Sequence, residues 1–498
     1  MRGKYKQLVT IGISSDTKEI DSYVLQGKEW IRKEELCRRP ELDFEDNDGK
    51  ARKDELERAN QFISQIDNII LNGSQLILDK VFEGVGFNQI TDEVFRQLII
   101  SRLSFPASKA ATVEYLKNHF DEDLDLSKIY RYLDRLNSTM QELVQDISVK
   151  HTMELFGGNI GVMFYDVTTL YFESDYEDDL RKTGFSKDGR HSNPQIILGL
   201  LVSLEGYPLA HTIHEGNKYE GHIMLPVIQD FVNRYDLDDF IVVVDSGLMN
   251  TANITELEAL GYKYIIGARI KNTDKATQDW ILSQPKRDRK MVELNYANGR
   301  RLLVGYTDDR AKKDSYNRKK GIKRLEKAYH RGQFTKSNLN KKGYNKFLEM
   351  KDSVKVTINY DKIEEDSRWD GLKGYLTNTS IPTEQVYAAY HNLWNVEKAF
   401  RIAKSKIEIR PMFHFTRKRI EAHICICFVA LKVYKELERI LKLAEIGMSV
   451  DKVLNMAKTV TILKLKLPLN GEILSKTMIM KRHKRIKILF NNDFWGTQ

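Results

Sequence analysis

The feature that most constrains the fold is an alternation of apolar runs and one-sided helical segments between residues 159 and 272. Short apolar runs are typical of β-strands, and Gln195–Leu204 is so uniformly apolar that both of its faces should be buried. Between the runs, apolar residues recur at three- and four-residue spacing, which predicts helices that cover a sheet. The predicted order is three strands, helix, strand, helix, strand, which indicates an α/β fold. The predicted strands are Ile160–Val167, Gln195–Leu204, Tyr207–His214, Phe240–Val244 and Tyr264–Ile270, and the predicted helices are Glu220–Asn233 and Thr251–Leu260.

A helical region precedes this alternating unit. Between Asn60 and Ile147 apolar residues recur with the period of an amphipathic helix. Within it, Ser108–Phe120 and Leu126–Leu136 are typical of two helices joined by a turn, with Ser127 as the N-cap of the second. Such a helix-turn-helix can lay its second helix in a DNA groove, and a small bundle with a solvated basic face fits the same pattern equally well. The predicted helices are Phe62–Val81, Val94–Leu103, Val113–Phe120 and Ile129–Val144, and residues 1–60 allow no clear prediction.

Residues 273–380 break the alternating pattern and are strongly basic. The stretch Lys312–Lys346 holds thirteen Lys and Arg against two acids, with aromatic residues interleaved. A run of like charge is usually a solvated surface. Here the local excess of +11 exceeds the +9 of the whole chain, which favours phosphate binding. Two predicted strands, Ser353–Tyr360 and Gly371–Thr377, close the segment, and a second basic cluster, Lys481–Lys487, lies near the end of the chain.

Cysteine usage and hydropathy narrow the class of protein. The three cysteines are Cys37, Cys425 and Cys427, an odd and sparse set that suits a reducing compartment. The last two are too close together for a metal-binding C-x-x-C and lie in an apolar run, so we expect them to be core thiols. No apolar stretch approaches the roughly 18 residues that span a membrane. We therefore expect a soluble cytoplasmic protein with no membrane partner.

Two acidic residues stand where predicted strands end. Asp166 lies at the end of the first strand, and Asp245 directly follows Ile241–Val244. An acid in this position lies at the carboxyl edge of a sheet, where α/β folds build their sites. If the two strands are neighbours, divalent cations are needed to neutralise the carboxylates, and oxygen ligands without a His or Cys cluster favour Mg²⁺ or Mn²⁺. Each Asp taken alone fits equally well as the N-cap of the helix or turn that follows it.

A third acid lies in a helical pattern that runs from Glu384 to about Leu443 with a break near Arg410–Pro411. One stripe of this helix carries a glutamate flanked by residues that can hold phosphate, and a metal site could be completed there. The alternative is an amphipathic surface helix with an ordinary Glu–Arg ion pair. The stripe consists of Tyr390, Leu393, Glu397, Arg401 and Lys404.

Taken together and in this order, three segments resemble the acidic motifs of bacterial insertion-sequence transposases of the DDE class. They are Asp166 within Tyr-Asp-Val-Thr-Thr, Asp245 within Val-Val-Asp-Ser-Gly-Leu, and Glu397 within Tyr-x2-Leu-x3-Glu-x6-Lys. The resemblance is to the branch with a β-rich insert between the second Asp and the Glu, and it covers roughly residues 150–440. Its specificity comes from the order and co-occurrence of the motifs. Shorter similar fragments are Gly184-Phe-Ser-Lys-Asp-Gly-Arg, Gly206-Tyr-Pro-Leu, Glu215-Gly-Asn and Arg410-Pro.

The resemblance implies an α/β fold of the RNase H-like kind, with a mixed-sheet catalytic core, an inserted β-rich basic domain and an N-terminal all-α DNA-binding region. The implied division of the chain is 1–60 (unassigned), 61–150 (helical, DNA-binding), 151–272 (first part of the core), 273–380 (basic insert), 381–445 (core helix with the Glu) and 446–498 (basic C-terminal region).

The resemblance also implies the chemistry: metal-dependent cleavage of DNA at transposon ends, followed by strand transfer into target DNA. Two Mg²⁺ ions, replaceable by Mn²⁺, would be held with Asp166 bridging both, Asp245 on one and Glu397 on the other. The expected partners are transposon-end DNA and target DNA, bound by a homodimer, in the cytoplasm of a bacterium and associated with its nucleoid. The residues expected to bind DNA are Tyr390, Arg401, Lys404, Lys187, Arg190 and Lys398.

One position departs from the family pattern. Leu393 stands where the third motif usually has Arg, so that phosphate contact is lost or is supplied by Lys398 or Arg401, and a hairpin intermediate is in doubt. Two other functions fit the same residues: a nuclease that cuts without joining, and a domesticated DNA-binding protein without catalysis. A small-molecule α/β enzyme is disfavoured, since the sequence has no P-loop, dinucleotide fingerprint or nucleophile elbow. Three histidines near the third motif are assigned no role: His391, His414 and His423.

Overall fold

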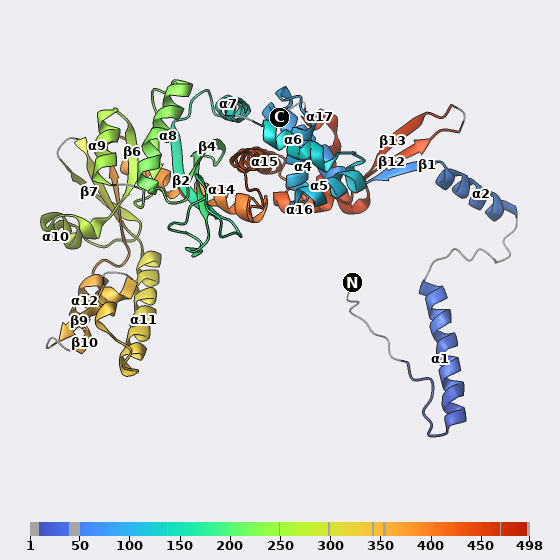
Figure 1. Cartoon of the computed structure of the whole chain (residues 1–498), viewed down its shortest axis with the longest axis horizontal. Helices are drawn as coiled ribbons and strands as arrows, with labels where there is room; N and C mark the ends of the chain where they lie inside the picture. The colour runs from blue at the N-terminus through green and yellow to red at the C-terminus, as the bar shows by residue number, and fades with distance from the viewer. Residues whose placement is uncertain are drawn as a thin grey trace. The chain divides into compact units, whose positions relative to one another are not determined.

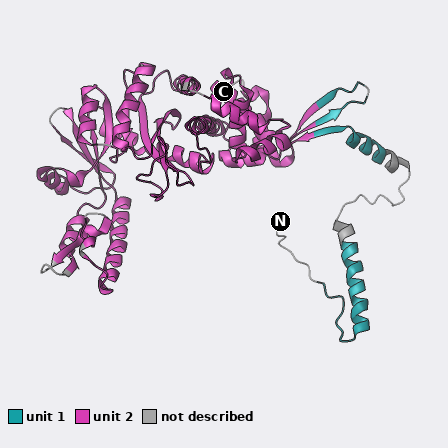
Figure 2. Cartoon of the chain, in the orientation of Figure 1, with its two compact units in different colours: residues 1–68, 464–474 teal, residues 69–463, 475–498 magenta. Residues whose placement is uncertain are grey.

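The computed structural model describes residues 9–38, 50–136, 138–248, 250–296, 299–340, 343–351, 355–468 and 470–495. The chain forms two compact units, one of residues 1–68 and 464–474 and the other of residues 69–463 and 475–498 (Figure 2). The smaller unit contains helices α1 (Thr17–Arg38) and α2 (Lys50–Ser64). The side chain of Cys37 lies outside the described residues.

A three-stranded sheet contradicts one predicted helix. Strands β1 (Ile66–Ile70), β12 (Thr461–Lys466) and β13 (Ile473–Met478) form it in the order β1-β12-β13. The predicted helix Phe62–Val81 is therefore wrong at its centre, because β1 separates α2 from α3 (Gly73–Val85). The partner of β1 comes from the far end of the chain, and local periodicity cannot reveal such a pairing.

An eight-stranded mixed sheet forms the centre of the larger unit, in the order β4-β3-β2-β5-β6-β11-β8-β7 (Figure 1). Its first five strands and two helices confirm the predicted order of elements and the α/β fold. The strands are β2 (Val162–Tyr171), β3 (Gln195–Ser203), β4 (Pro208–Glu215), β5 (Ile241–Val244) and β6 (Lys263–Ala268), and the helices are α8 (Glu220–Tyr235) and α9 (Thr251–Ala259).

The two faces of the sheet are covered by different helices. Alternate residues of β2, such as Met163 and Tyr165, share a core with the apolar residues of α8 and α9. Phe164 instead shares a core with helices α13 (Thr383–His391), α14 (Trp394–Ser405) and α15 (Arg417–Leu443). Because side chains of a strand alternate between its faces, the even-numbered residues of β2 point toward α13 and α14.

The helical region forms a bundle around α15. Its helices are α3, α4 (Glu93–Ser104), α5 (Lys109–Tyr115), a π-helical turn (Leu116–Phe120), α6 (Leu126–Arg135) and α7 (Ser138–Leu155). Helix α15 packs against α3, α4 and α6 and also against α14 and β4, so it joins the bundle to the sheet. Cys425 and Cys427 are buried in α15, as expected for core thiols. The predicted pair of helices at 108–136 is confirmed, but the N-cap of α6 is Asp125, and the Ser127 hydroxyl donates a hydrogen bond to the Asp125 carboxylate.

The basic segment is partly built into the central sheet. Strands β7 (Lys290–Asn295), β8 (Arg301–Tyr306) and β11 (Leu372–Thr377) extend the sheet beyond β6, and β9 (Leu348–Lys351) and β10 (Lys355–Ile358) form a separate hairpin. The predicted strand Ser353–Tyr360 is found as β10, and its first two residues lie outside the described ones. Most of the basic run forms a long helix. The helices of this segment are α10 (Lys275–Ser283), α11 (Asp308–His330) and α12 (Tyr360–Ser367).

The remaining elements lie near the C-terminus. They are α16 (Val450–Ala457), a 3-10 segment at Lys481–Phe490 that contains the second basic cluster, and α17 (Asn492–Trp495). Throughout the described ranges, no helix is both long enough and apolar enough to cross a membrane.

Candidate active site

Asp166, on β2, and Asp245, the first residue after β5, lie just beyond the paired part of two neighbouring parallel strands. The register of β2 and β5 pairs Val162 with Ile241 and Phe164 with Val243. Continued by two residues, the same register places Asp166 opposite Asp245. Both follow the alternation that faces α13 and α14, so the two carboxylates emerge on one face of the sheet.

The prediction that Asp166 ends its strand is wrong. Strand β2 continues to Tyr171, because its antiparallel pairing with β3 runs on to Tyr171 opposite Gln195. Its parallel pairing with β5 ends at Phe164. Asp166 therefore lies beyond the shorter neighbour, at the carboxyl edge of the parallel part of the sheet, while its own backbone stays within the β2–β3 ladder.

The Asp166 carboxylate is partly buried and lies in a crowded charge environment. The backbone N–H of Val167 donates a hydrogen bond to its Oδ1 at 2.8 Å, and Lys187 Nζ lies 3.6 Å from the same oxygen. Burial raises the pKa of Asp166, the charge of Lys187 opposes that shift, and the carboxylates of Glu220 and Asp245 add to it. The electrostatics indicate that Asp166 and Asp245 repel each other, as two ligands of a shared cation do before it binds.

Asp245 is held by a tyrosine from α13. The hydroxyl of Tyr390 donates a hydrogen bond to Asp245 Oδ1 over 2.8 Å. The tyrosine is only 4% exposed, and burial together with the negative charge of Asp245 raises its pKa, so it stays a neutral donor. Gly267 in β6 leaves room for it, because a Cβ there would lie 2.5 Å from the Tyr390 hydroxyl oxygen.

Glu397 lies in the first turn of α14 and is exposed. The predicted continuous stripe from Tyr390 to Lys404 is wrong at its start, because α13 ends at His391 and α14 begins at Trp394. Backbone hydrogen bonds of the three-residue kind, such as Leu393 N–H to the carbonyl of Tyr390, tighten the chain here. The break leaves Tyr390 and Glu397 on separate helices.

Lys373 is a site residue that sequence reasoning missed. It lies on β11, with its Nζ 4.4 Å from the centre of the Tyr390 ring. Burial and the nearby Arg310 lower the pKa of Lys373, while the negative charges of Asp245 and Glu397 oppose that shift. Lys373 therefore interacts electrostatically with both carboxylates. Because β11 joins the sheet from the far end of the basic segment, no spacing in the sequence connects Lys373 with the acids.

Glu220 is a second residue that sequence reasoning missed. It begins α8, and Lys187 Nζ lies 3.4 Å from its Oε2 as well as near Asp166. The same Nζ donates a hydrogen bond to the carbonyl of Val167 at 2.6 Å. Lys187 therefore joins β2 to α8 and neutralises two acids at once.

The other residues predicted to bind DNA differ in their exposure and in whether an acidic residue already pairs with them. Lys404 Nζ lies 3.3 Å from Asp188 Oδ2, and Lys398 Nζ lies 2.6 Å from Glu438 Oε1. Arg401 is exposed and makes no ion pair with any residue that the structure describes. Arg190 is exposed, and its guanidinium lies 5.0 Å from the centre of the Tyr171 ring. Leu393 is buried, so it presents no polar group to a phosphate.

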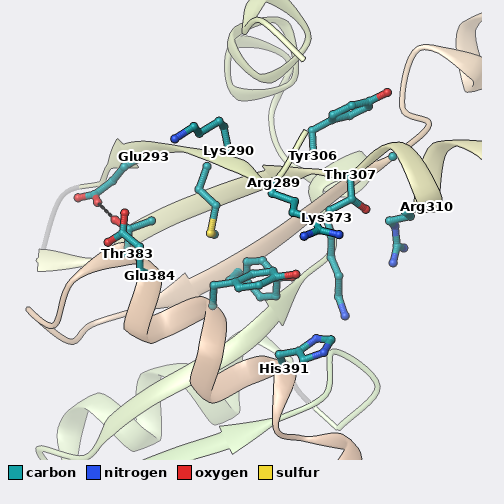
Figure 3. Close-up of a pocket in the computed structure, with 15 residues that line it drawn as sticks. Arg289, Lys290, Glu293, Tyr306, Thr307, Arg310, Lys373, Thr383, Glu384 and His391 are labelled. Carbon is teal, nitrogen blue, oxygen red and sulfur yellow. Dashed lines mark hydrogen bonds between the residues drawn. The ribbon is translucent and has the colours of Figure 1, made fainter. Parts of the chain in front are cut away.

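A pocket of about 550 Å³ adjoins the carboxylates and shares Lys373 with them. In Figure 3, Arg310 and Lys373 lie at one end of the pocket, while Glu293 and Glu384 lie at the other end together with Lys290, so the excess of positive charge is at the end with Arg310 and Lys373. Tyr387 and His391 stack on its floor with ring centres 5.8 Å apart. A pocket that combines cations with aromatic rings suits the phosphates and bases of a nucleic acid.

The fit of these residues to a divalent metal can be judged from the donor set. Asp166, Asp245 and Glu397 supply only hard carboxylate oxygens, and burial, with smaller effects of the Glu220 and Asp245 charges, raises the pKa of Asp166, a shift that a bound cation would oppose. In the described part of the chain, no three His, Cys, Asp or Glu side chains lie close enough to hold one ion. Asp166 and Asp245 have Lys187 and Lys373 as neighbouring positive charges, and a metal site made of all three acids would need Glu397 to move closer.

Comparison with known proteins identifies one matching family model. The sequence model described as "Transposase DDE domain" matches residues 158–432, which is more than half of the chain. No curated protein matches the sequence. Among solved structures, similarity is found to the cryo-EM structure of a piggyBac transposase synaptic complex with hairpin DNA, at 9% identity and a TM-score of 0.38, covering 77% of this chain and 70% of that one. A score that low carries no weight for function.

Proposed function

Because this chain belongs to the family of transposases with a DDE domain, its function is DNA transposition, and we propose that Asp166, Asp245 and Glu397 are its three catalytic acids. The single observation that supports this assignment is the matching register of Asp166 and Asp245 on one face of the sheet, beneath the helices that carry Tyr390 and Glu397. The proposed reaction is cleavage at the ends of the element, followed by joining of those ends to target DNA.

Members of the family use divalent metal ions, and we propose two Mg²⁺ ions, replaceable by Mn²⁺, for this chain. Asp166 would contact both ions, with Asp245 on one and Glu397 on the other. When bound, the ions activate the attacking oxygen and stabilise the leaving oxygen of the phosphodiester. Tyr390 orients Asp245 through its hydrogen bond, and Lys187 places a positive charge beside the Asp166 carboxylate.

The basic residues around the carboxylates would hold the DNA. Arg401 and Arg190 are exposed and available for phosphate. Lys187 lies beside Asp166, and Lys404 lies beside Asp188. Burial lowers the pKa of Lys404, while the Asp188 carboxylate keeps its charged form favoured. Tyr390 is buried against Asp245, so its proposed part in DNA binding is indirect, and Lys398 must leave Glu438 to reach a phosphate. A homodimer that pairs two transposon ends, working in the cytoplasm where bacterial DNA lies, completes the proposal.

The test is strand cleavage of DNA that carries the element's own ends, with Mg²⁺, using the wild type, Asp166→Asn and Glu397→Gln. We expect metal-dependent cutting by the wild type and none by either variant, with DNA binding retained. Glu256→Gln, an exposed change on α9 outside the site, serves as the matched control. A target plasmid in the same reaction separates joining from cutting alone. Equal binding with no cutting by any form would leave a DNA-binding protein without catalysis.

A further inference from the structure

Four basic side chains gather in the interior between the helical bundle and α15. They are Arg102 on α4, Lys109 on α5, His414 in the segment between α14 and α15, and His423 on α15, and their exposed fractions are 7%, 5%, 9% and 4%. The two imidazole rings have centres 5.3 Å apart. Positive side chains are seldom buried in this way unless something pairs with them.

Within the described ranges, no acidic side chain pairs with this cluster. The side chains of Arg102 and Lys109 form no hydrogen bond or ion pair with a residue that the structure describes. The charge effects on the two histidines come mainly from Lys109 and Arg102, which together with burial lower the pKa of His414 to about 4 and that of His423 well below its ordinary value. Burial and Arg102 also lower the pKa of Lys109 to about 7. The nearby Arg419 is already paired, with its Nε 2.6 Å from Asp134 Oδ1.

The cluster contains a buried polar atom that lacks a hydrogen-bond partner, which core packing does not explain. His423 Nε2 lies 3.2 Å from the carbonyl of Ile409, while His423 Nδ1 is buried without a partner. The cluster therefore has unmet hydrogen-bonding capacity in the interior.

The charge of the cluster decides which kind of ligand it suits. Two histidines with Cys427 Sγ 3.7 Å from His423 Nε2 resemble part of a metal site. Arg102 and Lys109 would repel a cation there, and burial raises the pKa of the Cys427 thiol, which keeps the sulfur protonated. An anion, in contrast, would offset the charge of Arg102 and Lys109 and accept hydrogen bonds from the guanidinium, the ammonium and an imidazole N–H.

We propose that Arg102, Lys109, His414 and His423 form a binding site for a phosphate group, separate from the carboxylate site. The segment that carries His414 also shows how a larger phosphate-bearing ligand would be held. His414 points inward, while its neighbours Phe413 and Phe415 are 65% and 58% exposed. Aromatic rings beside a phosphate site suit the sugars and bases of a nucleic acid strand. The phosphate can thus come from the DNA backbone or from free phosphate in solution.

The test measures binding by the full-length protein and does not depend on cleavage. Thermal unfolding is followed in phosphate and in chloride at equal ionic strength, and binding of a short DNA duplex is followed by fluorescence anisotropy over a range of salt concentrations. The variants are Lys109→Met and His414→Gln, and the controls are Lys28→Met, which removes an exposed lysine from α1, and Lys432→Met, which removes a buried lysine that is hydrogen-bonded to Ser148 and Thr152.

We expect one of two results for the wild type, and each identifies a source. If free phosphate is the ligand, phosphate raises the melting temperature of the wild type and of both controls but not of Lys109→Met or His414→Gln. If the DNA backbone is the ligand, inorganic phosphate has no effect, and the slope of log affinity against log salt falls by about 1 in Lys109→Met, since one phosphate contact is lost. In either case Lys109→Met without ligand should melt no lower than the wild type, because an unpaired buried charge has been removed.

The proposal is overturned if neither phosphate nor DNA distinguishes the two variants from the controls. A lower melting temperature of Lys109→Met without ligand would also contradict it, because that result means that the lysine already has a partner inside the protein. Cleavage that persists in Asp166→Asn and Glu397→Gln, with the binding difference intact, would count against the proposed catalytic acids and leave the phosphate site standing.

Discussion

Tyr390 and Asp245 are joined by a hydrogen bond of 2.8 Å although they lie on different layers of the fold, one on helix α13 and the other at the end of strand β5. The bond fixes the orientation of Asp245, one of the proposed metal ligands. Tyr390 lies on α13, which ends before α14, the helix that carries Glu397, begins. The third motif therefore supplies two separate parts of the site, an orienting hydroxyl and a carboxylate.

Tyr390→Phe should lower the cleavage rate about 10- to 100-fold, the range for losing a hydrogen bond that orients a metal ligand. DNA binding should change little, because the buried hydroxyl of Tyr390 points to Asp245 and not to solvent. Loss of one hydrogen bond to an exposed carboxylate should cost about 1 kcal/mol of unfolding free energy. Tyr387→Phe on the same helix is the control. Equal cleavage by both variants would show that the hydrogen bond does not orient Asp245.

Gly267→Ala should act on the same bond by displacing Tyr390. A Cβ at this position would lie 2.5 Å from the Tyr390 hydroxyl oxygen, so the ring or strand β6 must shift. We expect a loss of about 1–3 kcal/mol of stability by denaturant unfolding, together with slower cleavage. Gly161→Ala has no atom within 4 Å of the added Cβ and is the matched control. A stability of Gly267→Ala equal to that of the control would mean that the site can absorb the methyl group.

Asp166→Asn should abolish cleavage yet raise the melting temperature at neutral pH by a few degrees. Burial raises the pKa of Asp166 above its ordinary value of 3.8, so its charged form is less favourable in the folded chain than in the unfolded chain. Protonation removes that cost, and the wild type should therefore approach the variant in stability as pH falls through the raised pKa toward 3.8. Thermal unfolding of both proteins across this range measures the effect. A variant that melts lower than the wild type at pH 7 would show that Lys187 more than compensates for burial.

Lys373→Met should separate metal binding from DNA binding. Its ammonium group lies near Asp245 and Glu397, where it competes with a cation, so its removal should lower the Mg²⁺ concentration needed for half-maximal cleavage by about two- to fivefold. DNA affinity should fall at the same time, with a salt slope smaller by about 1. Lys290→Met, in the same pocket, is the control for the loss of one charge. An unchanged Mg²⁺ requirement would remove Lys373 from the carboxylate site.

The sequence allows the core of the fold and the acids to be predicted because their signals are local. The uniformly apolar run that becomes β3 and the four β-branched residues before Asp245 can be interpreted without knowledge of any distant partner. Lys373 and Glu220 could not be predicted as site residues, because they reach Asp166 and Asp245 only through the pairing of β11 with β6 and the packing of α8. The break between α13 and α14 was missed for another reason: the residues at 391–393 include no Pro or Gly, and three-residue hydrogen bonds end the helix without a breaker in the sequence.

The place of β11 in the sheet has a consequence for how the chain is assembled. Strand β6 pairs on one side with β5, which precedes it closely, and on the other with β11, which is synthesised only after the helices and the hairpin of the basic segment. Until then the apolar edge of β6 is open, and an open edge invites pairing with another chain. Removing residues 273–380 would leave that edge exposed for good. The basic segment therefore cannot be detached as a module, since the strand that follows its hairpin and helices is the one that closes the catalytic sheet.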